Sequence, residues 1–153
     1  MPELVIFVGL QASGKSTFYR ERMKATHALV SKDLFPSARN RERRQSRLLR
    51  DALGAGRNVV LDNTNPSRDA RRGPIAIARE LGAAVIGFYF ESRLDLSRER
   101  NAARPFPVPE VALRATAALL ERPSLDEGFD ALSYVAIRGD GFLVLPWNDD
   151  DLR

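Results

Sequence analysis

The chain has 153 residues, a length that fits one domain with a sizeable hydrophobic core. Apolar residues make up 44% and charged residues 29%, as in an ordinary globular protein, and the formal charge of +4 permits an anionic partner such as nucleic acid. The absence of cysteine excludes disulfides and thiolate metal sites, a lone His27 cannot build a histidine cluster, and no apolar run approaches the ~20 residues that span a bilayer.

The first predicted element is a buried strand that leads into a phosphate loop. Residues 4–8 (LVIFV) are consecutive and apolar, as in a strand covered on both faces. The spacing that follows, from Gly9 over four residues to Gly14 and Lys15, is that of a Walker A loop, and a helix is expected from Ser16 onward. Because a buried strand and a helix are the context that such a loop requires, the pattern predicts binding of a nucleoside triphosphate.

Strands and helices alternate along the rest of the chain. Strands are predicted at 27–31, 58–62 and 84–90, and helices at 38–53, 67–82, 93–104 and 110–122. The segments 132–137 and 142–147 predict a closing strand or a hairpin, and the acidic end 148–153 is expected to be frayed. The alternation predicts an α/β protein of the P-loop NTPase type, with a central parallel sheet flanked by helices on both faces. We expect a single domain over residues 1–153.

The chemistry of the phosphate loop follows from its residues. Glycine lets the backbone wrap closely around phosphate oxygens, while successive N–H groups and the helix N-terminus face the anion. Lys15 can bridge the β- and γ-phosphates, and Ser16 can ligate Mg²⁺. We therefore expect ATP and Mg²⁺ as cofactors. The nucleotide contacts are expected from Gly9, Ala12, Ser13, Gly14, Lys15, Ser16 and Thr17.

Three further segments bear on which molecule accepts the phosphate. Asp33 follows the second predicted strand, where its carboxylate can take the proton of a hydroxyl or cap the next helix. Asp62, in LDNTNP, ends the third strand and can hold Mg²⁺ through water or contact the acceptor, although these residue types also form turns. Arg100 and Arg104 are four residues apart on a predicted helix, which favours a lid at about 98–108 over a solvated helix face.

Together these segments resemble a known family. GLQASGKST, SKD, LDNTNP and RERNAAR, in this order and with these gaps, are similar to the kinase domain of 5′-OH polynucleotide kinases. The later segment RPSLDEGFD, at 122–130, is also similar to a part of that group, and the likeness runs from about Leu4 to Val135. The resemblance implies a P-loop kinase that transfers the γ-phosphate of ATP to the 5′-hydroxyl end of DNA or RNA, in nucleic-acid repair.

The resemblance also implies a role for each matched residue. Asp33 matches the general base that takes the proton of the 5′-hydroxyl. Lys15 and Ser16 match the phosphate and Mg²⁺ ligands, with Asp62 as a further ligand through water. Arg100 and Arg104 match lid arginines that contact the donor phosphates. Acceptor contacts are expected from Asp33, Asp62, Asn63, Thr64 and Asn65.

The sequence departs from the family pattern in two ways. Family members often carry an arginine three residues after the base, where it grips the acceptor's phosphate, and here Pro36 stands at that place. The candidates to replace it are Arg39, Arg41, Arg43 and Arg44. The phosphatase or ligase domain that often accompanies this kinase is not in the sequence, so we expect the kinase step of end-healing alone, with a separate phosphatase or ligase as partner.

Two other functions fit the phosphate loop. One is a kinase of a small metabolite such as a sugar, a nucleoside or an antibiotic, and the other is an ATP-binding regulatory or toxin-like module. The arginine-rich helix at 39–50 favours nucleic acid, since a groove that tracks a strand must neutralise several phosphates. The start of the chain lacks the basic leader of a signal peptide, so we expect a cytoplasmic protein with no membrane partner. Oligomeric state, nucleotide donor and the choice between DNA and RNA stay open.

Overall fold

The computed structural model describes residues 1–148, so most of the acidic end that we expect to be frayed lies outside the described residues. The strands are β1 (Glu3–Val8), β2 (Ala28–Val30), β3 (Val59–Asp62), β4 (Ala84–Phe90), β5 (Ala131–Arg138) and β6 (Gly141–Pro146). The helices are α1 (Lys15–Arg22), α2 (Arg41–Gly54), α3 (Arg68–Glu80), α4 (Leu94–Ala102) and α5 (Glu110–Leu119), with short 3-10 turns η1 (Lys32–Leu34) and η2 (Leu125–Glu127).

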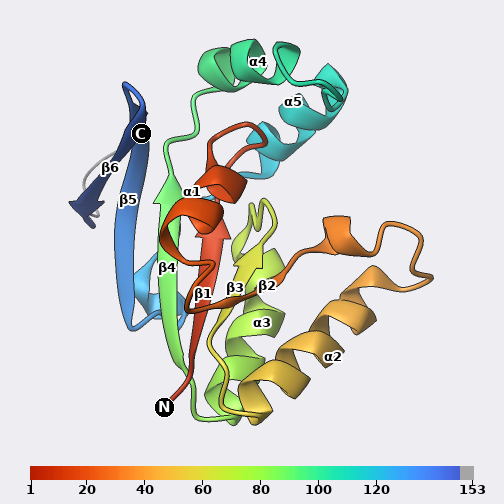
Figure 1. Cartoon of the computed structure of the whole chain (residues 1–153), viewed down its shortest axis with the longest axis vertical. Helices are drawn as coiled ribbons and strands as arrows, with labels where there is room; N and C mark the ends of the chain where they lie inside the picture. Colours follow the sequence, from red (N-terminus) through yellow and green to blue (C-terminus); the bar gives the residue numbers. More distant parts are fainter. Residues whose placement is uncertain (149–153) are drawn as a thin grey trace.

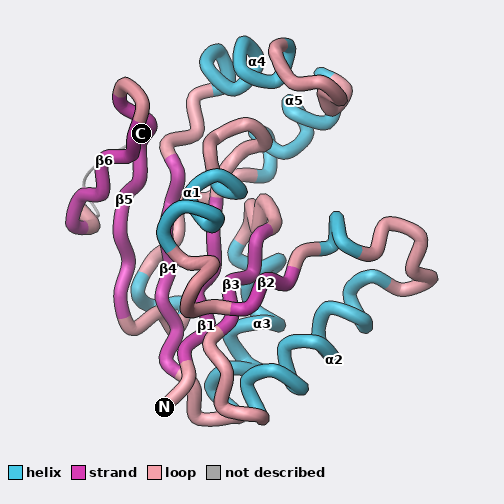
Figure 2. The backbone as a smooth tube through the Cα atoms, in the orientation of Figure 1, coloured by secondary structure: helices cyan, strands magenta, loops and turns pink. Residues whose placement is uncertain are grey.

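The six described strands form one sheet in the order β2-β3-β1-β4-β5-β6 (Figures 1 and 2). Neighbours from β2 to β5 are parallel, and β6 pairs with β5 in the antiparallel sense. The turn between β5 and β6 contains Gly139 at φ +58°, a conformation that glycine adopts without strain. The predicted α/β fold with a central parallel sheet is therefore confirmed, and the closing segments form a hairpin at its edge.

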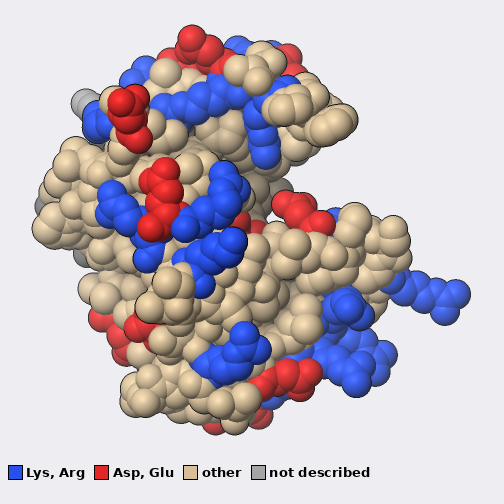
Figure 3. All heavy atoms as spheres, viewed as in Figure 1, with Lys and Arg blue, Asp and Glu red and all other residues tan. Residues whose placement is uncertain are grey.

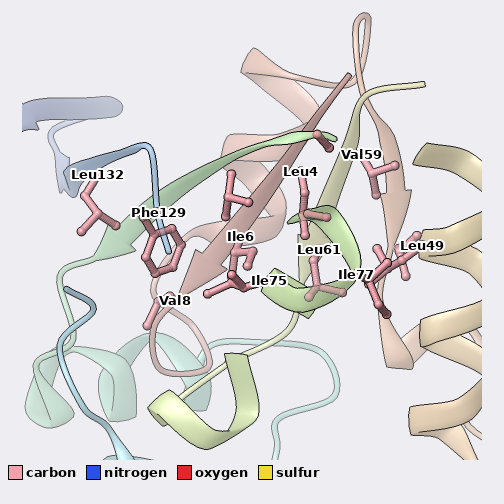
Figure 4. Packing of buried hydrophobic residues seen from close by; sticks show 14 of the residues in the cluster. Leu4, Ile6, Val8, Leu49, Val59, Leu61, Ile75, Ile77, Phe129 and Leu132 are labelled. Atoms are coloured by element: carbon pink, nitrogen blue, oxygen red, sulfur yellow. The ribbon is translucent and has the colours of Figure 1, made fainter. Parts of the chain in front are cut away.

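The side chains of β1 alternate between two hydrophobic cores, one on each face of the sheet. Leu4, Ile6 and Val8 are fully buried in the larger core, where they meet side chains of α2 and α3, including Leu49 and Ile75 (Figure 4). This burial on both faces explains why β1 reads as an unbroken apolar run.

Helix α1 covers the second face through an aromatic cluster. Phe18 meets Phe7 at 5.8 Å and Phe90 at 5.4 Å between ring centroids, in edge-to-face arrangements that aromatic pairs favour. Phe142 of β6 closes the cluster at 5.2 Å from Phe18. These contacts fix the helix that follows the phosphate loop against the sheet, and so fix the loop itself.

The four helices predicted at 38–53, 67–82, 93–104 and 110–122 are all shorter than expected, and two of them show the cause plainly. The predicted helix 38–53 begins only at Arg41, because the Asn40 side chain caps it by accepting a 3.0 Å hydrogen bond from the N–H of Arg43. The predicted helix 93–104 ends at Ala102, before Pro105, whose ring disfavours a helical residue at Arg104. The expectation that Arg100 and Arg104 share a helical face is therefore wrong, since Arg104 lies in the loop after α4.

Candidate functional site

A cleft of about 640 Å³ lies where the phosphate loop, η1, the loop after β3 and the segment after α4 meet. In the surface view it is a hollow between the lobe of α4 and α5 and the part of the molecule that carries α2 (Figure 3). Most of the predicted site residues line it, namely Ala12, Gly14, Lys15, Ser16, Thr17, Asp33, Asp62, Asn63, Thr64, Asn65, Arg100 and Arg104. Segments far apart in the sequence thus come together at one place.

Gly9 and Ser13 do not line the cleft but shape the loop from beneath. A Cβ on Gly9 would lie 3.0 Å from the Cβ of Phe90, so a side chain there would force its neighbours to shift. The Ser13 hydroxyl donates a 2.7 Å hydrogen bond to the carbonyl of Leu10. Ala12 and Gly14 have φ of +60° and +97°, so the loop holds the left-handed turns that can point successive N–H groups toward an anion.

Lys15 is buried at the floor of the phosphate loop. Its ammonium donates hydrogen bonds to the carbonyls of Gly9 (2.9 Å) and Leu10 (2.6 Å). Burial lowers the pKa of Lys15 from 10.5 to about 8, and the nearby Asp62 carboxylate opposes this shift. The ammonium is thus held in place, and the nearby carboxylate offsets only part of the cost of burying its charge. A buried cation of this kind is suited to bind phosphate oxygens.

Ser16 and Asp62 form a pair of oxygen ligands at the entrance to α1. The Ser16 hydroxyl donates a 2.9 Å hydrogen bond to Oδ2 of Asp62, the last residue of β3. Asp62 is buried, and burial raises its pKa, while the charge of Lys15 lowers it. The prediction that Asp62 ends its strand beside the phosphate loop is confirmed.

This pair fits Mg²⁺ delivered together with a nucleotide. Hydroxyl and carboxylate oxygens are the ligands that Mg²⁺ prefers, and the ion usually takes one or two carboxylates together with substrate phosphates. Within residues 1–148, no group of three or more His, Cys, Asp or Glu side chains forms an all-protein metal cage. Ser16 and Asp62 are the residues that would hold the ion.

Asp33 presents a carboxylate to the cleft. The N–H of Asp33 donates to the hydroxyl of Ser31, which caps η1, and Asn40 caps α2, so the alternative role of Asp33 as a helix cap is wrong. Its side chain is 94% exposed, and its nearest cationic neighbour is Arg41, at 3.9 Å. The carboxylate is therefore accessible to a hydroxyl that enters the cleft.

The loop after β3 is held by side-chain hydrogen bonds. Asn63 accepts from the N–H of Lys32 (2.9 Å) and donates to the side chain of Gln45 (2.7 Å). Asn65, at φ +43°, donates from its side chain to the carbonyl of Phe7 (2.7 Å). Both asparagines line the cleft, but their amides tie the loop to β1, η1 and α2, so they have a structural role whatever they contact in a substrate.

A buried ion pair supports the same loop from the other side. Arg71 of α3 is fully buried, and its guanidinium binds both carboxylate oxygens of Glu127 at 2.8 and 3.0 Å. It also donates to the carbonyl of Asn65 at 2.8 Å. The segment 122–130, which resembles a part of the polynucleotide kinases, thus braces the loop that follows Asp62.

The lid segment brings two of its three arginines to the cleft. Arg100 and Arg104 line the cleft, whereas Arg98 pairs with Glu110 of α5 and does not. Buried Asn101 closes the turn after α4, donating to the carbonyl of Val108 (2.8 Å) and accepting from its N–H (3.0 Å). The two arginines therefore reach the cleft from a clamped segment.

Besides Arg71 and Asn101, sequence reasoning missed Gln45 and Gln11 as supports of the site. Gln45 is buried on the apolar face of α2, and its side chain accepts a hydrogen bond from Asn63. The signal in the sequence is that this polar residue lies four positions before Leu49, and so on the same apolar face of the helix. Gln11 of the phosphate loop donates to Thr116 of α5 at 3.0 Å and so links the loop to the lid lobe. Nothing in the sequence marks this contact.

The strand order, the phosphate loop between β1 and α1, and the Ser16–Asp62 pair define the class of this protein as a P-loop kinase fold. Residues 4–123 match the family described as an AAA domain, and the chain belongs to that family. In the part of the chain that the structure describes, no helix is long and apolar enough to cross a membrane.

One relative confirms the resemblance to polynucleotide kinases. The chain is 27% identical over 145 residues to a bifunctional polynucleotide phosphatase/kinase of Schizosaccharomyces pombe, an alignment that covers 89% of this chain and 34% of that protein. The chain thus spans about a third of that relative's length.

The solved structures that share this fold include both an RNA kinase and a sugar kinase. A fungal RNA kinase has a TM-score of 0.70 at 14% identity, covering 100% of this chain and 41% of that chain. A gluconokinase from Sinorhizobium meliloti 1021 has a TM-score of 0.63 at 18% identity, covering 88% of this chain and 82% of that chain. At such identities the likeness shows the fold alone.

Proposed function

We propose that this chain transfers the γ-phosphate of ATP, with Mg²⁺, to the 5′-hydroxyl end of DNA or RNA. The observation that carries the proposal is the cleft itself, which brings the phosphate loop, the exposed carboxylate of Asp33 and the guanidinium of Arg41 to one place. The relative from Schizosaccharomyces pombe supports the choice of acceptor, since its name includes a polynucleotide kinase.

The donor side binds and polarises the triphosphate. The N–H groups of the loop and Lys15 hold the β- and γ-phosphates, and Ser16 and Asp62 hold Mg²⁺, which neutralises charge on the phosphates when bound. Arg100 and Arg104, on a lid at about 98–108, stabilise the charge that develops in the transition state. Each of these roles uses a side chain that lines the cleft.

The acceptor side positions a hydroxyl for in-line attack. The hydroxyl oxygen forms a bond to the γ-phosphorus, the bond between that phosphorus and the β,γ-bridging oxygen breaks, and ADP leaves. Asp33 accepts the proton of the hydroxyl. Arg41, the nearest cation to Asp33, takes the place of the arginine that is absent at Pro36 and grips the acceptor's phosphate. Asp62, Asn63, Thr64 and Asn65 complete the acceptor wall.

The surface of α2 supports a polynucleotide acceptor. Exposed arginines stand just before and along this helix, namely Arg39, Arg41, Arg43, Arg44, Arg47 and Arg50. Basic side chains gather on this part of the surface in Figure 3. Among the described residues, Arg39, Arg43 and Arg47 have no carboxylate within ion-pair distance, so their charge is available to phosphates. A small sugar needs no such surface beyond the site.

A small-metabolite kinase is the second candidate, because the Sinorhizobium meliloti gluconokinase shares the fold over 88% of this chain. The test is incubation with γ-labelled ATP, Mg²⁺ and 5′-OH DNA and RNA oligonucleotides, beside a panel of sugars and nucleosides. Label on an oligonucleotide is the expected result, and Arg41→Ala should raise the KM for it. Label on a sugar or nucleoside with none on any oligonucleotide would overturn the proposal. ATP binding without transfer to either would indicate the regulatory module.

As proposed, the chain performs the kinase step of end-healing. The name of the relative combines a phosphatase with the kinase, and the chain spans about a third of it. We propose a phosphatase or ligase as the partner of this kinase step, to be tested by pairing this chain with such an enzyme on a nicked strand with damaged ends.

A further inference from the structure

Phe106 is a large apolar side chain at the rim of the cleft, and its exposed fraction is 90%. It lies two residues after Arg104 and two before Val108, and both of these residues line the cleft. Two extended residues span at most about 7 Å, so Phe106 cannot lie far from the cleft that its neighbours enter. Its ring therefore stands in solvent next to the proposed active site.

The loop that contains Phe106 is fixed by hydrogen bonds and by two prolines. Asn101 makes two hydrogen bonds to the backbone of Val108, at 2.8 and 3.0 Å, and so closes the turn that contains Phe106. Pro105 and Pro107 flank the ring and fix the backbone φ on either side of it. A clamped loop with restricted dihedrals presents the ring as a pre-ordered platform.

The chemistry of the cleft indicates what this platform meets. Phosphate-binding groups and Asp33 occupy the interior, so the reacting end of an acceptor lies inside and the rest of a longer acceptor must leave past the rim. A nucleobase offers an apolar face to an aromatic ring, and base stacking tolerates any sequence because every base has such a face. A sugar or another small metabolite does not extend past the rim.

We propose that Phe106 stacks on the nucleobase of the second nucleotide of the acceptor strand. The second nucleotide is favoured because Val108 lines the cleft that would hold the reacting end. Phe106, two residues before Val108 and outside this lining, lies within about 7 Å of it, a distance of two base steps of about 3.4 Å each. This inference rests on the proposed function and adds a subsite to it. The subsite predicts that dinucleotides and longer acceptors are better substrates than a single nucleotide.

The subsite is tested by a double-mutant cycle in which one change is a protein variant and the other is the removal of a base from the acceptor strand. The kcat/KM of wild type and of Phe106→Ala is measured on three 5′-OH oligonucleotides: one intact, one abasic at the first nucleotide and one abasic at the second. We expect Phe106→Ala to lower kcat/KM by about 5- to 150-fold on the intact strand and on the strand abasic at the first nucleotide. On the strand abasic at the second nucleotide, the two proteins should differ by less than about twofold.

Two further variants serve as controls. Phe106→Tyr keeps an aromatic face and should retain wild-type kcat/KM. Val111→Ala removes another exposed side chain, 73% exposed on α5 and not in the lining of the cleft, and should leave all three rates unchanged. Unchanged melting temperatures of all variants verify that they fold.

The outcomes separate this inference from the proposed function. An equal loss on all three strands would mean that Phe106 acts on the lid and not on a base, and no loss on any strand would also overturn the proposal. A loss that vanishes only on the strand abasic at the first nucleotide would overturn the placement. If wild type labels no 5′-OH oligonucleotide, the proposed function itself fails and the subsite fails with it.

Discussion

The hydroxyl of Ser31 accepts a hydrogen bond from the N–H of Asp33, and this bond releases the Asp33 carboxylate from any capping role. Serine caps a turn as well as aspartate does, so η1 does not need the carboxylate. A charged side chain that is 94% exposed, beside a phosphate loop and one guanidinium, is available for chemistry.

Asp33→Asn should therefore lower turnover by roughly 10²–10⁴-fold, because the amide keeps the size of the side chain but cannot take a proton. ATP affinity and melting temperature should stay near those of wild type, since the side chain caps no helix. Asp51→Asn, an exposed acidic residue of α2 that does not line the cleft, is the matched control. A kcat within a few-fold of wild type would assign the base to another residue, with Asp62 the next candidate.

Lys15 gives a prediction on pH. Its pKa of about 8 means that the ammonium loses its proton as the pH rises through that value, and a neutral amine does not bind phosphate. ATP affinity should therefore be highest below pH 8 and fall above it. Lys15→Ala should abolish turnover and weaken ATP binding at all pH values, without the fall above pH 8. Titrations with ATP from pH 6.5 to 9.5 test this, and an identical pH profile in the variant would contradict it.

The lid arginines differ in a way that a single pair of variants can measure. Arg104→Ala should lower kcat by ~10³-fold or more, because it removes charge stabilisation from the transition state. Arg98→Ala should leave kcat unchanged, since Arg98 pairs with Glu110 away from the cleft. Equal kcat values for the two variants, at equal stability, would mean that Arg104 is a solvated surface residue without a role in turnover.

Ser16 and Asp62 predict a specific dependence on Mg²⁺. Ser16→Ala removes one oxygen of the pair and the hydrogen bond that orients Asp62, so the Mg²⁺ concentration for half-maximal rate should rise by roughly 10–100-fold. Thr26→Ala removes an exposed hydroxyl that does not line the cleft and serves as control. An unchanged Mg²⁺ requirement in Ser16→Ala would place the ion elsewhere.

The sequence predicts the fold well because its strongest signals are local. The apolar run of β1, the phosphate loop and the residues that end each strand depend on neighbours within a few positions, and these predictions are confirmed. The prediction failed for the end of α4, where Pro105 acts on Arg104 and shortens the helix. The pattern of helix-forming residues up to Arg104 does not include this restriction by the following proline.

The parts of the site that sequence could not predict depend on contacts between distant segments. The bond of Gln45 to Asn63 joins residues 18 positions apart, and the bond of Gln11 to Thr116 joins residues 105 apart. Neither pair has a spacing that marks it, because only the packing of the helices on the sheet brings them together. The positions of the residues in short motifs could therefore be predicted, whereas the contacts that support the site required the structure.

The ion pair between Arg71 and Glu127 gives the last prediction. Both side chains are almost fully excluded from water, with 0% and 4% exposure, and Glu127 also accepts from the N–H of Ser124 at 2.9 Å. Removing one member of such a pair leaves the other charge buried, which typically costs about 3–5 kcal/mol of unfolding free energy. Arg71→Ala should therefore be strongly destabilising, and Arg71→Lys less so because it keeps the charge.

The neighbouring arginine provides the control for this measurement. Arg72 pairs with Asp69 at 2.6 Å, but both side chains are exposed, so Arg72→Ala should change the unfolding free energy by only about 0–1 kcal/mol. Urea unfolding of the two variants compares two adjacent arginines of one helix, of which Arg71 is buried and Arg72 is exposed. Arg71→Ala should also impair turnover at temperatures where the variant is folded, because the carbonyl of Asn65 loses its donor and the loop that follows Asp62 loses a support. If Arg71→Ala were no more destabilising than Arg72→Ala, the buried pair would not brace this loop.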